Sequence, residues 1–179
     1  MEESDLAAEA IRNQLIQTLP YLQTLIGFDL ETVDFDANVI VGENQIPISR
    51  ACEEFYNSLR ENIGHRFAAT ATSKLLHLLQ PNLFVMWDNN ILAFYRRNNP
   101  NIRDSGSGYC AFLRSMQEMA INIHEAFSRQ TQGQEDDPAT FLSEQLRYDQ
   151  PQTLAKFIDE YNWVTITKRV SVPPPWHPC

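Results

Sequence analysis

The sequence has no uninterrupted apolar run of about 18 residues, the length that a membrane-spanning helix requires. Its first residues are acidic, whereas a secretory signal peptide places positive charge before an apolar segment. Only three cysteines occur, Cys52, Cys110 and Cys179, and their wide spacing is typical neither of a disulfide framework nor of a zinc site. We therefore expect a soluble, cytoplasmic protein with reduced thiols and no membrane segment.

Basic residues are also scarce, since 14 Lys and Arg face 23 Asp and Glu and the formal net charge is -9. Affinity for duplex DNA rests largely on Lys and Arg that displace counterions, so this balance disfavours generalised binding to nucleic acid. Residues 50–115 are the exception, with eight basic and five acidic side chains. An excess of this size also arises from chance variation of charge along a sequence. If an anionic partner such as DNA or RNA binds, we expect it to dock on this segment.

Of the six glycines only Gly106 and Gly108 are clustered, and no Gly-Lys-Ser follows them, which excludes a phosphate-binding loop of that type. The four histidines never recur at the spacing of a zinc-binding helix. A nucleophile elbow around a serine is absent as well. The sequence therefore predicts no metal and no cofactor.

Helical periodicity is the main feature that is present. At 179 residues with 43% hydrophobic side chains, the chain suits one domain with a sizeable core. Apolar residues recur at helical spacing in the segments 4–18, 48–60, 68–79, 89–97 and 109–127, and further helices are expected to begin near residues 138 and 151. We predict a mainly α fold: a single compact domain of six to seven helices over residues 1–172, with at most a small β-hairpin or short strands.

Some finer expectations concern the ends and joins of these helices. The first helix is predicted to end near Pro20, and the segment 68–79, apolar on nearly all sides, to be the central helix. Alternation within residues 32–41 predicts a small hairpin, and alternation within 165–172 predicts a strand. Ser105 to Gly108 is expected to be a hinge. The proline-rich tail, residues 173–179, either lies over its own domain or binds a protein partner as polyproline II.

Two side chains bracket the junction between the helices 68–79 and 89–97. Lys74 lies at the edge of the apolar face of the first helix, and Asp88 stands at the head of the second. A lysine among apolar neighbours loses solvation, which favours its neutral, nucleophilic amine. An aspartate at a helix N-terminus is favoured in its ionised form and can stabilise a developing cation. Lys74 and Asp88 are therefore the candidate catalytic residues.

Residues 64–97 resemble the helix-hairpin-helix DNA glycosylase superfamily, whose members excise damaged bases from DNA with an all-helical fold. The resemblance lies in the order of a helix, Lys74, an apolar turn, Asp88 and a second helix that ends in Arg96 and Arg97. It implies that Lys74 is the reacting lysine and Asp88 the partner carboxylate. The sequence departs from the family before Lys74, where Ala and Thr replace the glycines of the hairpin.

Other interpretations of the same residues stay open. Asp88 serves equally well as a helix N-cap, and Lys74 as a solvated surface cation. The predicted nucleic-acid contacts are four arginines of the central segment: Arg66, Arg96, Arg97 and Arg103. The alternative function is a non-enzymatic protein–protein interaction module with an acidic surface.

Overall fold

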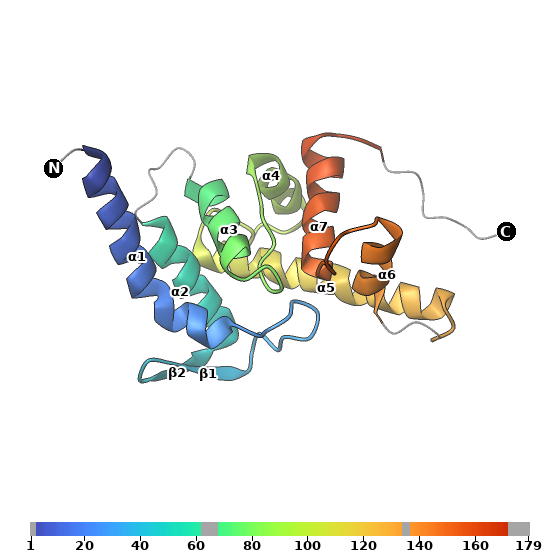
Figure 1. Ribbon diagram of the computed structural model, residues 1–179, viewed down its shortest axis with the longest axis horizontal. Coiled ribbons are helices and arrows are strands. Elements are labelled where there is room, and N and C mark those ends of the chain that lie inside the picture. Colours follow the sequence, from blue (N-terminus) through green and yellow to red (C-terminus); the bar gives the residue numbers. More distant parts are fainter. Residues whose placement is uncertain (1–2, 62–67, 134–136, 172–179) are drawn as a thin grey trace.

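The long helix α5 (Gly106–Gln130) runs along the molecule, and the helices α2 (Ile48–Arg60), α6 (Pro138–Gln145) and α7 (Leu154–Asn162) pack against it (Figure 1). The computed structural model describes residues 3–61, 68–133 and 137–171. In this part of the chain the helices are α1 (Glu3–Leu25), α2, α3 (Ala68–Leu79), α4 (Asn89–Asn98), α5, α6 and α7, and one hairpin is the only sheet. The prediction of a single, mainly α domain is confirmed.

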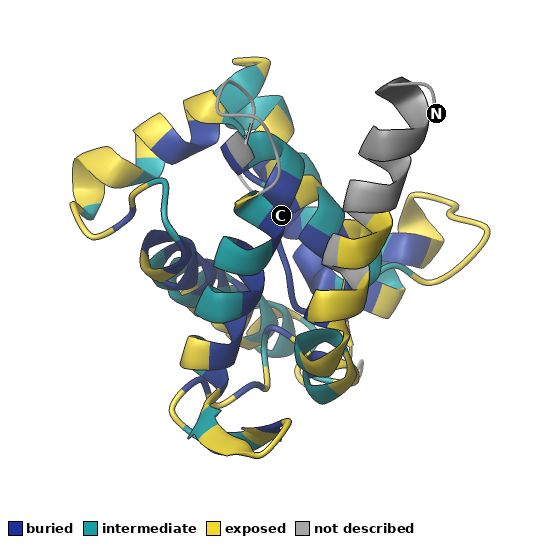
Figure 2. Ribbon diagram, turned by 90° about the vertical axis from the view of Figure 1, so that its left-hand side faces the viewer, coloured by how far each residue is buried: buried dark blue, intermediate teal, exposed yellow. Residues whose placement is uncertain are grey.

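The helices α2 and α5 hold the core between them. The apolar stripe that the sequence predicts on α2 is buried, from Ile48 through Phe55 and Tyr56 to Leu59. The Tyr56 ring stacks on Tyr109 of α5 with centroids 4.8 Å apart. Viewed from one end, buried residues line the inner sides of the helices and exposed residues the outer sides (Figure 2). No helix in the described ranges is both long and apolar enough to span a bilayer.

The helix α1 does not end at Pro20, and that prediction is wrong. Proline removes one helical hydrogen bond and crowds the preceding turn, which costs about 3 kcal/mol in a helix interior. Here the carbonyl deprived of its donor belongs to Ile16, which is 52% exposed and open to solvent. The turn beyond Pro20 packs against the core: Leu25 is fully buried and the Tyr21 ring stacks on Phe55. This packing offsets the proline and extends the helix.

A hairpin forms in the region where one was expected, but its strands lie closer to the C-terminus than predicted. Its strands are β1 (Asn38–Val41) and β2 (Asn44–Pro47), paired antiparallel with Val41 opposite Asn44. The turn residue Gly42 has φ of +61°, a conformation that glycine adopts without strain. The earlier run, residues 32–35, is not a strand; its Val33 and Phe35 are buried in the core instead.

The helix α3 is not the central helix. Its buried side carries Ala69, Thr72, Ser73 and Leu76, whereas Leu78 on the predicted face is 77% exposed. When a helix carries apolar residues on nearly all of its sides, the periodicity of the sequence does not indicate which side is buried.

The predicted hinge at Ser105–Gly108 is instead the start of α5. Ser105 is the N-cap, and its hydroxyl accepts a hydrogen bond from the Gly108 amide at 3.1 Å. Both glycines are buried, and a Cβ on Gly108 would collide with the backbone of Arg103. These glycines permit close packing rather than flexibility.

The strand predicted for residues 165–172 is also wrong over the residues that the structure describes. Residues Trp163–Thr167 form η1, a π-helical extension of α7. The Thr165 hydroxyl donates to the Tyr161 carbonyl at 2.6 Å, which keeps this β-branched residue in a helical turn. The proline-rich tail 173–179 and Arg66 lie outside the described residues.

Candidate functional site

The connection between α3 and α4 crosses the core without regular structure, and side chains satisfy its backbone carbonyls. The His77 ring donates from Nδ1 to the Phe84 oxygen at 2.6 Å, because a carbonyl oxygen only accepts. The Tyr109 hydroxyl donates to the Val85 oxygen at 2.9 Å. Buried carbonyls need such partners, so this segment is held in one conformation.

Trp87 fixes the end of this connection. Its indole nitrogen donates to the Ala69 oxygen at 3.2 Å, and its own backbone oxygen accepts from the Ser73 hydroxyl at 3.0 Å. The ring centroid lies 5.0 Å from that of Tyr109 and 5.2 Å from that of Phe112. Trp87 is 1% exposed, and it sets the position at which α4 begins.

Asp88 is the N-cap of α4, as the sequence predicts. Its Oδ1 accepts hydrogen bonds from the amides of Asn90 at 2.8 Å and Ile91 at 2.9 Å. Its second oxygen, Oδ2, accepts from the Thr167 hydroxyl of η1 at 2.6 Å. Both oxygens are therefore occupied, and Asp88 joins the start of α4 to the C-terminal end of the described helices.

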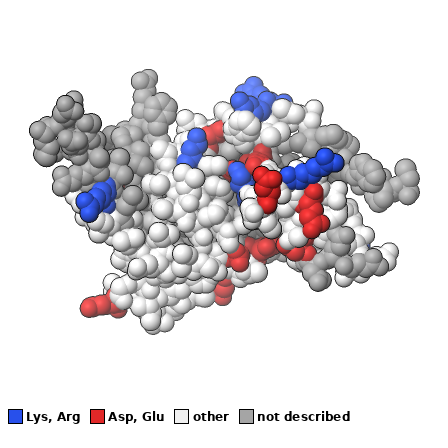
Figure 3. Space-filling model, in the orientation of Figure 1, with Lys and Arg blue, Asp and Glu red and all other residues white. Residues whose placement is uncertain are grey.

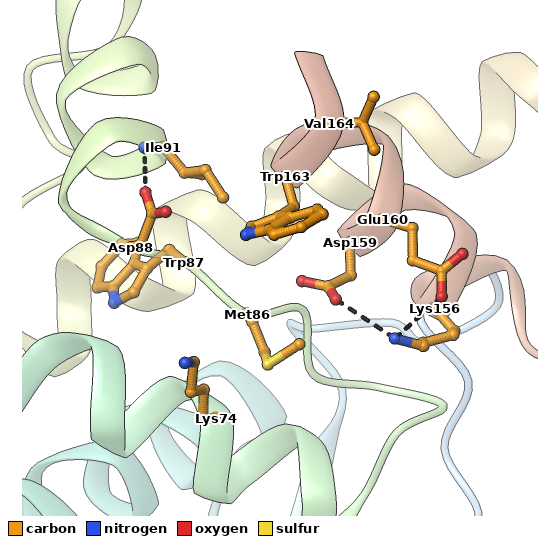
Figure 4. A pocket seen from close by; sticks show the side chains of 10 residues that line it. All are labelled: Lys74, Met86, Trp87, Asp88, Ile91, Lys156, Asp159, Glu160, Trp163 and Val164. Atoms are coloured by element: carbon orange, nitrogen blue, oxygen red, sulfur yellow. Dashed lines mark hydrogen bonds and ion pairs between the residues drawn. The ribbon is translucent and has the colours of Figure 1, made fainter. Parts of the chain in front are cut away.

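A cleft of about 530 Å³ opens between α3, α4 and the pair α7–η1, and it contains both residues that the sequence singles out. Lys74 enters it from α3, where its side chain is exposed, and Asp88 stands on the α4 side (Figure 4). Apolar side chains of Met86, Ile91 and Val164 also line the cleft. The structure thus brings Lys74 and Asp88 to one cleft.

The opposite wall comes from α7. The Lys156 ammonium lies 3.2 Å from a Glu160 carboxylate oxygen and 3.7 Å from Oδ2 of Asp159. Lys74, in contrast, has no carboxylate within ion-pair distance among the described residues. Figure 4 shows the Lys74 amine and the Asp159 carboxylate directed toward the same space. Lys74 is therefore the cation of this cleft that is available to an external anion.

Trp163 of η1 also lines the cleft. Its side chain is 48% exposed, which is unusual for so large an apolar ring. The Lys168 ammonium lies 4.6 Å from the centroid of this ring, in a cation–π arrangement. An accessible indole beside an apolar floor and a free amine suits a planar, anionic ligand.

Four residues of the cleft were not predicted from the sequence: Lys156, Asp159, Glu160 and Trp163. One signal was present: Asp159 and Asn162 fall at helical spacing with Leu154, Ala155 and Ile158, so two polar residues interrupt a buried stripe. A carboxyl on a buried stripe is a signal of a site, because a buried carboxyl needs either a polar or charged partner or a proton. No local pattern links α7 with Lys74 or Asp88.

The environment of Asp159 disfavours its charge. Burial raises the pKa of its carboxyl above the ordinary value, while the charges of His77 and Lys156 and the Met86 amide act in the opposite direction. Glu160, the neighbouring acid, raises the pKa further. The side chain is 4% exposed and borders the cleft. Asp159 is thus the carboxyl in this cleft that holds a proton at higher pH than an exposed aspartate.

We expect this raised pKa to appear in the pH dependence of stability. The folded state binds the Asp159 proton more tightly than the unfolded state, so stability from protonation is present below the unfolded pKa. It is lost as the pH rises through the folded pKa, by about 1.4 kcal/mol for each pH unit between the two values. Asp159→Asn, which keeps an acceptor for the Met86 amide, should remove this loss.

The measurement is urea denaturation of both proteins between acid and neutral pH. The wild type should lose stability relative to Asp159→Asn as the pH rises. The contributions of ionisable groups that both proteins share cancel in the difference between their free energies of unfolding. A difference that stays constant, or that changes in the opposite direction, would contradict the assignment.

The predicted arginines do not gather at this cleft. Arg96 donates from Nε to the Ile102 oxygen at 3.2 Å, so it serves the loop after α4. Arg97 lines a separate groove, and Arg103 is exposed on the loop before α5. None of these three borders the cleft, and their roles in binding nucleic acid stay predictions.

Metal chemistry finds no support in the described residues, because they contain no group of three or more His, Cys, Asp or Glu side chains arranged to hold an ion. The two conspicuous carboxyls of the cleft each have other partners: Asp88 caps a helix and Asp159 faces Lys156. The chemistry available is that of an amine, a buried acid and an indole ring.

The resemblance to the helix-hairpin-helix glycosylases stays a prediction. The order that carries it, a helix with Lys74, a connection and a helix capped by Asp88, is present as α3 and α4. Residues 64–67, where the family's hairpin would start, lie outside the described residues. Comparison with known proteins places the chain in no family: no family model, no curated protein and no solved structure matches it.

Proposed function

We propose that this protein binds one nucleotide of a single-stranded or unpaired nucleic acid in the cleft, and acts on it as a glycosylase-like domain with Lys74 as the reacting amine. The observation that carries the proposal is the meeting of Lys74, Asp159 and the exposed Trp163 ring around one cavity (Figure 4). Lys74 comes from α3, whereas Asp159 and Trp163 come from α7 and its π-helical extension η1, and together they match the parts of a nucleotide.

The base is matched by the aromatic wall. Stacking of a base on an aromatic side chain contributes about 1 to 3 kcal/mol, and it tolerates any base because each has a π face. Trp163 offers nearly half of its surface, and Ile91 and Val164 add apolar contacts beside it. The cavity of about 530 Å³ is of the size that holds a small ligand.

The sugar and phosphate are matched by Lys74, whose charge is not consumed by a carboxylate of the described chain. Once it has given up a proton, the Lys74 amine can attack C1′ of the nucleotide, forming a carbon–nitrogen bond while the bond to the base breaks. Asp159 retains its proton to higher pH than usual and is positioned at the same cavity. It is the acid that can protonate the departing base.

The surface charge favours an unpaired nucleotide over a long duplex. Figure 3 shows Lys and Arg in small separate groups on this face, with Asp and Glu among them. A duplex footprint requires a broad basic surface. A single nucleotide needs one cation and one ring, which the cleft provides.

The test is binding of a fluorescently labelled single-stranded oligodeoxynucleotide, measured by anisotropy at low salt. Trp163→Ala should weaken binding by about 5-fold to 150-fold, because stacking of about 1 to 3 kcal/mol is lost. Trp163→Phe keeps an aromatic ring and should retain most of the affinity. Undetectable binding by the wild type, or equal affinities of the three proteins, would refute the proposal and leave the protein-interaction alternative.

A further inference from the structure

A second hollow lies beside the cleft, between the outer side of α4 and the turn formed by α7 and η1. It is a groove of about 520 Å³. Ala93, Phe94 and Arg97 of α4 form one rim, and Tyr161 and Arg169 form the other. The cleft and the groove are therefore on opposite sides of the contact between α4 and η1.

The groove is basic on an acidic protein. Arg97 and Arg169 stand on its two rims, and no Asp or Glu is among the described residues that line it. Within the described ranges, neither arginine has a carboxylate at ion-pair distance, whereas Arg50, Arg60 and Arg114 each pair with one. Two arginines without acid partners facing one groove favour an anionic occupant.

The rims also carry exposed aromatic rings. Phe94 is 43% exposed and Tyr161 is 51% exposed. The floor, in contrast, is internally satisfied, because the Tyr95 hydroxyl donates to Asn162 Oδ1 at 2.9 Å. A ligand therefore meets rings and guanidinium groups at the rims and no unpaired polar group on this part of the floor.

The π-helical turn divides its side chains between the two hollows. Trp163 and Val164 face the cleft, and Thr165 and Ile166 face the groove. Such turns are rare and are frequent at functional sites. The segment ends at Arg169, whose φ of +57° costs a non-glycine residue about 1 to 2 kcal/mol. Arg147 has the same conformation after α6, so this conformation marks the end of a helix. At Arg169 the same conformation also places the side chain at the groove.

We propose that this groove is a second subsite for the same nucleic-acid strand, binding a phosphodiester between Arg97 and Arg169 and a neighbouring base on Phe94 or Tyr161. The proposal rests on the proposed function of the cleft, and it specifies the substrate as an oligonucleotide rather than a mononucleotide. A strand lying across the α4–η1 contact places one nucleotide in the cleft and its neighbour in the groove.

Two probes distinguish the subsites: a nucleoside monophosphate and a single-stranded oligodeoxynucleotide of about ten nucleotides, within the range of known single-strand sites. The Arg97→Gln/Arg169→Gln protein should bind the oligonucleotide about tenfold more weakly than the wild type. The slope of log affinity against log salt should decrease in magnitude by about 0.7, because one phosphate contact is lost from a single strand. Monophosphate binding should stay unchanged.

The matched control is Arg129→Gln/Arg147→Gln, which removes two exposed arginines from outside both hollows, one of them in the same left-handed conformation as Arg169. It should leave both affinities unchanged. If both double variants bind the oligonucleotide equally well, the groove proposal is wrong while the cleft proposal stands. Loss of oligonucleotide binding in the groove variant, with no effect of Trp163→Ala, would retain the groove and refute the cleft.

An acidic peptide is the other anion that two arginines could hold. A glutamate-rich peptide that displaces the oligonucleotide at equal concentration would overturn the assignment of the groove to nucleic acid. We expect no such competition, because the peptide supplies carboxylates but no rings for Phe94 and Tyr161.

Discussion

Replacement of Lys74 by Ala should abolish covalent capture of an abasic strand. In the wild type, the Lys74 amine adds to the aldehyde carbon of the opened abasic sugar, and loss of water gives an imine. Borohydride then delivers hydride to the imine carbon and leaves a stable secondary amine. Because the cleft contains Lys74 without a carboxylate partner in the described chain, we expect this lysine to form the adduct.

The controls for this experiment are unusually complete, because the chain has only three lysines: Lys74, Lys156 and Lys168. Lys168→Ala should retain the adduct, and so should Lys156→Ala, since the Lys156 ammonium is held by Asp159 and Glu160. Lys74→Arg keeps the positive charge but forms no imine, so it should bind the strand without capture. A protein adduct detected by mass spectrometry in Lys74→Ala would exclude Lys74 as the nucleophile.

One half of the candidate site was predictable from local sequence. Asp88 stands before a short helix and after an apolar run, and this pattern predicts a cap wherever the helix packs. Lys74 precedes it on a helix that Pro81 ends, so the two were expected at one junction. Their meeting in a cleft depends on Trp87, whose burial and bond to Ala69 set the angle between α3 and α4.

The other half was not predictable in this way, because α7 lies some 80 residues from α3 in sequence. The Asp88–Thr167 hydrogen bond spans 79 positions, and no periodicity reports such a pairing. Residues 165–167 of the π-helical turn were predicted to begin a strand for a physical reason. Thr165, Ile166 and Thr167 are β-branched and typical of strands, but the contacts of η1 with α4 and the hydrogen bond from Thr165 to Tyr161 hold them in a helix.

Asp88→Ala should lower the stability of the protein through two separate losses. It removes the cap of α4, which is typically worth about 0.5 to 2 kcal/mol. It also removes the acceptor of the Thr167 hydroxyl, and hydrogen bonds to charged groups contribute about 1.5 to 3 kcal/mol. Since Asp88 is partly exposed, we expect a total loss of about 2 to 3 kcal/mol in the free energy of unfolding, measured by urea denaturation.

Asp88→Asn separates the structural role from a chemical one. Asparagine caps helices as well as aspartate does, and its amide can donate to the Thr167 hydroxyl, so stability should stay close to that of the wild type. If the Asp88 charge took part in the reaction, this stable variant would lose adduct formation. We expect it to keep the adduct, because both oxygens of Asp88 already accept hydrogen bonds from α4 and η1 and Asp159 is a second acid at the cleft. A double-mutant cycle with Thr167→Val should give a coupling of about 1 kcal/mol, which would locate the second role of Asp88 in joining the two walls of the cleft.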